Sequence, residues 1–216
     1  MRGGPLVSAR RPSKWTLLAL VFAAGVLIDQ WSKFLAVDRL TTAFLRAGAH
    51  TLPEKLSAYF RLSYLEPLAT EPYYVFRPLW RMAYVENPAA AFSMFTFVPP
   101  ALRYRMFIVI SIAAVFFVFH YYRKLAPSQR FVQVSLAFVL AGTVGNLVDR
   151  LARRYVIDFV EWYWWNRPDL RWPTFNVADS LLVVGIAMLL VHPAPKQASA
   201  SGEGRPPGNK RAASNV

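Results

Sequence analysis

Four apolar segments, each about 20 residues long, constrain this chain more than any other feature. They cover residues 15–37, 106–122, 131–148 and 175–192. A helix needs about 20 apolar residues to cross about 30 Å of hydrocarbon, and lipid offers no hydrogen-bond partner to the backbone. The segments therefore predict an all-α membrane protein with four transmembrane helices.

The basic residues predict the orientation of these helices. Residues 1–14 contain four Lys or Arg and no acid, and the short segment 123–130 contains three and no acid. Lys and Arg accumulate on the cytoplasmic side of membrane helices, so both termini are expected in the cytoplasm. The net charge of +13 then favours contact with membrane lipid and not with nucleic acid. A signal peptide, cleaved near Ala47-Gly48-Ala49, is the alternative for the first segment, but that triplet lies far downstream of the apolar run.

The predicted organisation has three parts. Residues 1–14 form a basic cytoplasmic N-terminus, residues 15–192 a membrane domain, and residues 193–216 a disordered cytoplasmic tail rich in Pro, Ala, Ser and Gly. The outer loop 38–105 is too long for a simple connection and predicts a small β and amphipathic subdomain. Within it, residues 73–76 and 81–86 favour strands, and residues 54–65 favour a short helix with Leu56, Tyr59, Phe60 and Tyr64 on one face.

Polar residues cluster at the outer ends of three apolar segments. The members are Asp29 and Lys33 in the first segment, Asn146, Asp149 and Arg150 at the third, and Asn176 and Asp179 in the fourth. Ionisable groups in a membrane are costly and mark candidate functional sites. Each also has a structural interpretation: an Asp29–Lys33 ion pair at i,i+4, an Asp149–Arg150 salt bridge at a helix end, and an Asn176 helix cap with Asp179 in the first turn.

Asp158 has no such structural explanation, because it stands in the apolar setting Val156-Ile157-Asp158-Phe159. If Asp158 and Asp179 meet, the two carboxyl groups would share one proton, which is the chemistry of aspartic peptide hydrolysis. The residues for other hydrolytic chemistries are missing. The chain has no cysteine to act as a nucleophile, and its three histidines are scattered and form no zinc motif.

Five motifs in this order resemble those of lipoprotein signal peptidase, the type II signal peptidase of bacteria. They are Asp29-Gln30-Trp31-Ser32-Lys33, Asn87-Pro88-Ala89-Ala90-Ala91-Phe92-Ser93, Gly145-Asn146-Leu147-Val148-Asp149-Arg150, Val156-Ile157-Asp158-Phe159 and Phe175-Asn176-Val177-Ala178-Asp179-Ser180. With the four spans, the resemblance covers about residues 15–192. Two features depart from it: Ala89 stands where the family usually has Gly, and the stretch between Lys33 and Asn87 is about two dozen residues longer.

The resemblance implies an aspartic endopeptidase of the bacterial inner membrane that acts near the outer face without a metal or other cofactor. It implies Asp158 and Asp179 as the catalytic pair. It further implies a supporting set of Asp29, Lys33, Asn87, Asn146, Asp149, Arg150 and Asn176. The expected substrate is a diacylglyceryl-modified prolipoprotein, cleaved before its lipidated cysteine by a monomeric enzyme. Two alternatives stay open: a small proton-coupled transporter that uses the same acids, and a non-catalytic protein that binds lipoprotein precursors.

Overall fold

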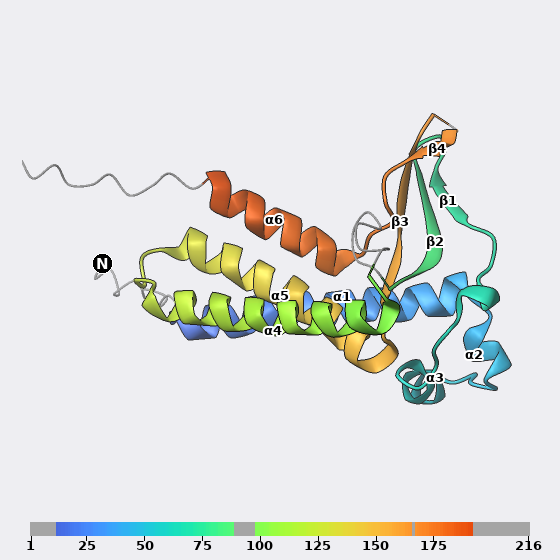
Figure 1. Cartoon of the computed structure of the whole chain (residues 1–216), viewed down its shortest axis with the longest axis horizontal. Coiled ribbons are helices and arrows are strands. Elements are labelled where there is room, and N and C mark those ends of the chain that lie inside the picture. Colours follow the sequence, from blue (N-terminus) through green and yellow to red (C-terminus); the bar gives the residue numbers. More distant parts are fainter. Residues whose placement is uncertain (1–11, 89–97, 166, 192–216) are drawn as a thin grey trace, which may run out of the picture.

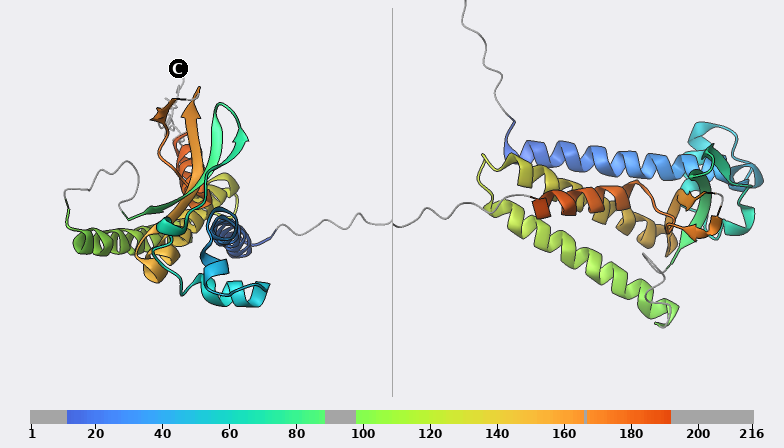
Figure 2. Two further views of the ribbon diagram at one scale, coloured as in Figure 1. Left: turned by 90° about the vertical axis from the view of Figure 1, so that its right-hand side faces the viewer. Right: turned by 90° about the horizontal axis from the view of Figure 1, so that it is seen from above.

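Long helices run side by side through the molecule in the computed structural model, which describes residues 12–88, 98–165 and 167–191 (Figure 1). The helices are α1 (Lys14–Leu40), α4 (Pro100–Lys124), α5 (Arg130–Arg153) and α6 (Val177–Val191). α5 is central and packs against the other three, while α4 diverges from them toward the end of the bundle that carries the sheet (Figure 2). The predictions for the N-terminal tail before residue 12, for Ala89 and the motif residues that follow it, and for the C-terminal tail lie outside the described residues.

The helices have the membrane character that the sequence predicts. Among the described residues, α1, α4 and α5 are long and apolar enough to cross a bilayer, and α6 is a shorter apolar helix of 15 residues. At 1.5 Å per residue α6 is about 22 Å long, less than the ~30 Å of a hydrocarbon core. Apolar side chains project outward from the bundle, as at Phe117, which is 77% exposed, and Leu190, which is 81% exposed. The predicted fourth crossing therefore remains a prediction.

Glycines allow α5 to approach its neighbours closely. A Cβ on Gly185 would lie 2.7 Å from the Ser135 carbonyl oxygen, and one on Gly25 would lie 2.7 Å from the Ala141 Cβ. A Cβ on Gly142 would collide with the carbonyl oxygen of Ala178, next to Asp179. Small residues at such contacts are typical of packed membrane helices. Here they bring the start of α6 against the outer half of α5.

A four-stranded antiparallel sheet extends from one end of the bundle, across the direction of the helices (Figure 1). Its strands, in spatial order, are β1 (Tyr73–Phe76), β2 (Trp80–Asn87), β3 (Val156–Trp164) and β4 (Arg167–Arg171). The two strands predicted in the outer loop are confirmed as β1 and β2. β3 and β4 were not predicted from the sequence. Asp158 consequently lies on a strand, opposite Val85 of β2, and not in a loop.

Two short helices, α2 (Ala43–Arg46) and α3 (Leu52–Tyr59), lie on the opposite side of α1 from the sheet (Figures 1 and 2). The 3₁₀ helix η1 (Glu66–Leu68) follows them and contacts β2. The Glu54 carboxylate accepts the backbone N–H groups of His50 and Thr51 at 2.8 and 2.9 Å, which starts α3 at Leu52.

The predicted helix over residues 54–65 is therefore wrong in its limits, and the predicted common face is wrong as well. Tyr59 is 2% exposed, whereas Leu56 and Phe60 are exposed. Tyr64 lies beyond the helix with φ of 57°. The predicted face is not shared because Tyr59 alone packs into the outer core, where its ring centroid is 5.5 Å from that of Phe34.

Two apolar cores hold the chain together. The outer core joins the end of α1 to α2, α3 and the sheet; its largest members are Phe34, Phe44, Tyr59, Tyr84, Tyr155, Ile157 and Phe159. The inner core joins α1, α4 and α5 at the other end; its members are Leu18, Tyr122, Leu125, Val132, Leu136, Ala137 and Leu140. The candidate polar residues lie between these two cores.

Candidate active site

Asp158 sits near the start of β3 with only 1% of its surface exposed. Two side-chain amides bind its carboxyl group: Asn87 Nδ2 donates to Oδ2 at 2.8 Å, and Asn176 Nδ2 donates to Oδ1 at 2.7 Å. The first comes from β2, the neighbouring strand, and the second from the residue before α6. Sheet pairing and the start of the last helix thus fix both oxygens of Asp158.

Asp179 lies in the first turn of α6 and is half-buried. Asn146 Nδ2 donates to its Oδ1 at 2.7 Å, and the backbone N–H of Asn176 donates to its Oδ2 at 3.3 Å. In return the Asn176 side-chain oxygen accepts the Asp179 N–H at 2.9 Å, which confirms the predicted helix cap. Asn176 therefore binds Asp158 through its side chain and Asp179 through its backbone, and brings the two predicted carboxyl groups to one place.

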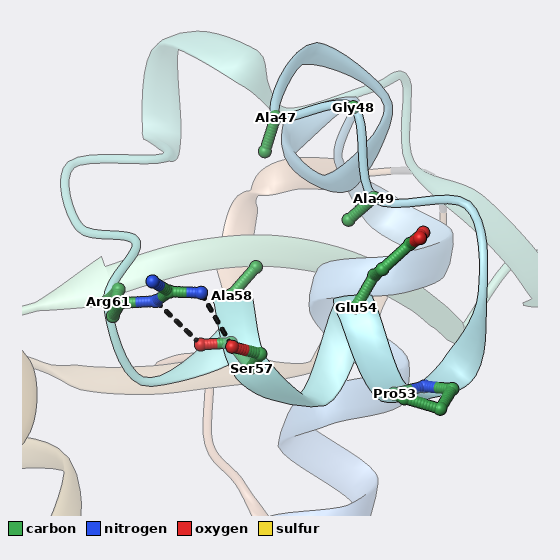
Figure 3. Close-up of a pocket in the computed structure, with 8 residues that line it drawn as sticks. All are labelled: Ala47, Gly48, Ala49, Pro53, Glu54, Ser57, Ala58 and Arg61. Carbon is green, nitrogen blue, oxygen red and sulfur yellow. Dashed lines mark hydrogen bonds between the residues drawn. The ribbon is translucent and has the colours of Figure 1, made fainter.

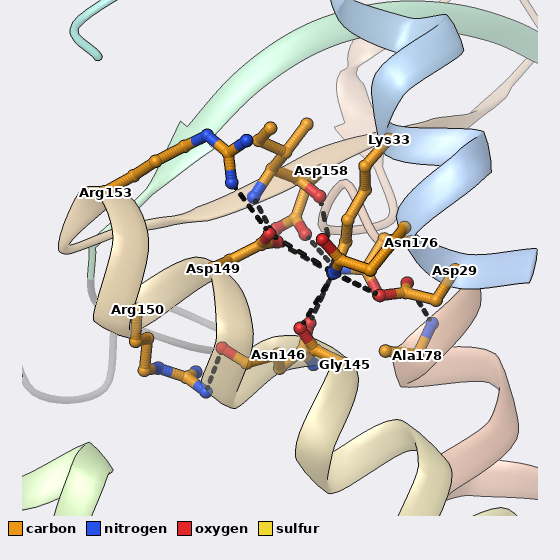
Figure 4. A network of polar contacts seen from close by, with 12 residues as sticks. Asp29, Lys33, Gly145, Asn146, Asp149, Arg150, Arg153, Asp158, Asn176 and Ala178 are labelled. Carbon is orange, nitrogen blue, oxygen red and sulfur yellow. Dashed lines mark hydrogen bonds and ion pairs between the residues drawn. The ribbon is translucent and has the colours of Figure 1, made fainter. Parts of the chain in front are cut away.

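A buried ion network lies behind this pair (Figure 4). Lys33 Nζ is 2.8 Å from Asp29 Oδ2 and 2.8 Å from Asp149 Oδ2, and all three side chains are fully buried. Lys33 also donates to Asn146 Oδ1 at 3.0 Å. The second oxygen of Asp29 accepts the backbone N–H of Ala178 at 2.9 Å. The network thereby ties α1 and α5 to the residue that precedes Asp179, and it confirms the predicted Asp29–Lys33 pair.

The predicted Asp149–Arg150 salt bridge is wrong. Asp149 pairs with Lys33 and with Arg153, whose Nη1 is 3.2 Å from Asp149 Oδ1. Arg150 instead donates to the backbone oxygen of Asn146 at 3.4 Å and lies over the Phe107 ring, 5.1 Å from its centroid. Adjacent residues diverge by about 100° around a helix, whereas residues four apart share a face, so Arg153 is the partner that Asp149 can reach.

Burial dominates the electrostatics of Asp158. Loss of water and the neighbouring Asp179 raise the pKa of Asp158 to about 7, against the opposing effects of the Asn87 and Asn176 hydrogen bonds and of Lys33. Asp179 contributes to this rise because a negative charge on Asp158 is unfavourable beside a second carboxyl group. The arrangement can therefore hold one proton between two acids near neutral pH.

Three further residues contribute to the buried ion network but were not among the predicted site residues. Gln30 Nε2 donates to Asp29 Oδ2 and to the Gly145 carbonyl oxygen, both at 3.1 Å. Gly145 leaves room for the Asp29 carboxylate, because a Cβ there would lie 2.6 Å from Oδ2. Arg153 completes the partners of Asp149. The i,i+4 spacing of Asp149 and Arg153 was the sequence signal available for the last of these.

Two surface hollows lie away from the carboxyl pair. One, of about 500 Å³, is formed by α3 and the turn before it (Figure 3); its lining residues are Ala47, Gly48, Ala49, Pro53, Glu54, Ser57, Ala58 and Arg61. Its two charged groups are already bound: the Arg61 guanidinium to Ser57, and the Glu54 carboxylate to the backbone N–H groups of His50 and Thr51. The other, of about 590 Å³, lies at the far end of the sheet and is aromatic; its lining residues are Phe76, Leu79, Trp80, Trp162, Tyr163, Trp164, Leu170 and Trp172.

Known proteins resemble this chain in both sequence and fold. The family model described as Signal peptidase (SPase) II matches residues 21–194. The lipoprotein signal peptidase of Anaeromyxobacter sp. (strain Fw109-5) is 58% identical over 207 residues, which cover 95% of this chain and 98% of that protein. The lipoprotein signal peptidase of Geobacter metallireducens is 40% identical over 177 residues, or 81% of this chain and 88% of that protein.

Two solved structures, both titled as a bacterial membrane enzyme, have the same fold. One has a TM-score of 0.59 at 18% identity and covers 85% of this chain and 96% of its own. The other has a TM-score of 0.57 at 19% identity and covers 82% and 86%. The fold likeness agrees with the sequence matches, which span most of the chain. The chain therefore belongs to the signal peptidase II family of membrane peptidases.

Proposed function

We propose that this chain is an aspartic endopeptidase that removes the signal peptide from diacylglyceryl-modified prolipoproteins by cleaving before the lipidated cysteine. The similar proteins named above are lipoprotein signal peptidases, which supports the substrate class. One observation carries the catalytic assignment: Asn176 holds Asp158 with its side-chain amide and Asp179 with its backbone N–H. Two acids bound to one residue, one of them almost fully buried, suit general acid–base hydrolysis.

In the proposed mechanism Asp158 holds the shared proton and donates a hydrogen bond to the scissile carbonyl oxygen. Its raised pKa, about 7, supports this assignment. Asp179 is proposed as the general base; it is half-buried, so water can reach it. It takes a proton from that water as the water oxygen attacks the carbonyl carbon. When the tetrahedral intermediate collapses, the C–N bond breaks and the proton passes from Asp179 to the leaving nitrogen.

The remaining predicted residues are proposed to hold this pair in place. Asn146 and Asn87 orient one carboxyl group each, and Lys33 balances the charges of Asp29 and Asp149. Arg150 lies on the same end of α5 and is proposed to bind the substrate backbone. No step in this mechanism requires a metal or another cofactor.

The membrane placement is also a proposal. We place α6 as a fourth crossing, both termini in the cytoplasm, and the carboxyl pair at the outer face of the inner membrane. The buried ion network gathers at the sheet end of the bundle, whereas Lys14 and Arg130 lie at the other end. Residues 15–192 then form a monomeric peptidase domain. The diacylglyceryl chains stay in the bilayer while the peptide bond enters from the side.

The proposal is tested with the purified chain in detergent and a diacylglyceryl-modified precursor. Mass spectrometry of the products should show a new N-terminus at the lipidated cysteine, with the same rate in excess chelator. An intact precursor would contradict the proposal. Binding without cleavage would favour a precursor-binding protein, and cation flux in proteoliposomes without cleavage would favour the transporter alternative.

A further inference from the structure

The chain between α1 and β1 folds as a compact unit, here called the outer segment (residues 41–69). Its two ends meet: Thr42 N–H donates to the Leu68 carbonyl oxygen at 2.9 Å, and Thr70 N–H donates to that of Leu40 at 2.9 Å. Phe44 and Tyr59 enter the outer core, at 3% and 2% exposed. The unit is therefore fixed to the end of α1 and is not a loose connection.

Arg153 joins this outer segment to the ion network. It occupies the last residue of α5 and is 2% exposed. Its Nη2 donates to the Tyr59 carbonyl oxygen at 2.8 Å, and its Nη1 donates to Asp149 Oδ1 at 3.2 Å. The guanidinium also lies over the Tyr59 ring, 4.1 Å from the centroid. A buried guanidinium is costly unless it is paired, so these contacts fix its position.

The link continues from Asp149 toward Asp158 (Figure 4). Asp149 Oδ2 contacts Lys33 Nζ at 2.8 Å and accepts the backbone N–H of Ile157 at 3.3 Å. Ile157 is fully buried and directly precedes Asp158. The Asp149 carboxylate thus binds Arg153 through Oδ1. Through Oδ2 it binds Lys33 and the backbone of β3 next to Asp158.

We propose that Arg153 is a positioning residue. It is anchored by the outer segment and fixes the position of Asp149. Asp149 in turn holds the start of β3 in the geometry that the carboxyl pair requires. This inference rests on the function proposed above. Arg suits the role because its planar fork reaches two acceptors at once, whereas a Lys ammonium is a single point charge on a flexible stem.

The test compares Arg153→Gln and Arg153→Lys with the wild type in the precursor cleavage assay, per folded protein. We expect Arg153→Gln to lower kcat about 100-fold, since displacing reacting groups by about 1 Å has an effect of that size. Arg153→Lys should lower kcat about tenfold, with KM in both variants within about twofold. Arg154→Gln, which removes the same charge one residue later at an exposed position, should leave kcat within about twofold.

Hydrogen–deuterium exchange supplies a readout independent of cleavage. In Arg153→Gln, amides of residues 52–60 and of 155–158 should both exchange faster than in the wild type and in Arg154→Gln. Normal kcat in a folded Arg153→Gln, or in Arg153→Lys if the first variant does not fold, would overturn the proposal. So would faster exchange confined to one of the two segments. A wild type that does not cleave would instead refute the proposed function, while the exchange experiment still tests the link.

Discussion

Gly145→Ala should lower both the turnover number and the free energy of unfolding. An alanine Cβ at this position would lie 2.6 Å from Asp29 Oδ2, where ordinary contact begins at 3.4 Å. One of the groups must therefore move by about 0.8 Å. Asp29 cannot turn aside freely, because it is fully buried and holds Lys33 and the Ala178 N–H. A displacement of Asp29 would therefore move Ala178, the residue next to Asp179.

The expected magnitudes follow from that overlap. Overpacking a buried contact costs about 1–3 kcal/mol of unfolding free energy. A shift close to 1 Å at reacting groups lowers kcat by about 30- to 100-fold. Both quantities are measured on purified protein, by unfolding in mixed micelles and by turnover of the lipidated precursor per folded molecule.

Gly185→Ala is the matched control for this prediction. Its Cβ would meet the Ser135 carbonyl oxygen at 2.7 Å, a similar overlap, but Gly185 lies about 9 Å along α6 from Asp179 and touches no member of the ion network. We expect a similar loss of stability with a much smaller loss of kcat. Equal kcat losses in the two variants, or full activity in a folded Gly145→Ala, would refute the positional argument.

Three further outcomes are expected. Lys33→Met leaves the buried carboxylates of Asp29 and Asp149 without their shared cation, and should destabilise the fold by about 3–5 kcal/mol in a micelle unfolding titration. The pH profile of kcat/KM should fall through an apparent pKa near 7 as the pH rises, because the raised pKa of Asp158 means that the pair loses its shared proton there. Asn87→Ala removes a hydrogen bond that lowers this pKa, so it should move the falling limb to higher pH.

Each of these outcomes has a contradicting result. Lys55→Met breaks a partly exposed ion pair with Asp38 and should cost less than about 1 kcal/mol, so an equal loss in Lys33→Met would refute the charge-balance argument. An activity that is constant from pH 6 to pH 9 would contradict proton sharing. A limb that moves to lower pH in Asn87→Ala would reverse the sign assigned to that hydrogen bond.

Local patterns predicted the features that depend on nearby residues. The apolar segments predicted helices, the aromatic and β-branched residues predicted β1 and β2, and the four-residue spacing predicted the Asp29–Lys33 pair. Asn176 and Asp179 predicted a helix start in the same way. The grouping of polar residues at one end also follows from the sequence, because all of them occupy the same ends of the apolar segments.

Features that depend on distant parts of the chain were not predictable in this way. β3 forms because its residues pair with β2, some 70 positions earlier in the chain, as Asp158 does with Val85. The i,i+4 spacing made Arg153 available to Asp149, but the second acceptor of Arg153, the Tyr59 carbonyl oxygen, is supplied only by the folded outer segment. Tyr59 likewise became buried because of Phe34, not because of its own helix.

The central claim is that Asp158 and Asp179 act together on the peptide bond, and turnover of Asp158→Asn and Asp179→Asn tests it most directly. Each variant keeps the shape of the side chain but removes an ionisable group, so each should lower kcat by at least about a thousandfold in a protein that still folds. Asp38→Asn, a carboxylate of α1 outside the network, should keep normal turnover. Cleavage at more than a tenth of the wild-type rate by either folded variant would contradict the account.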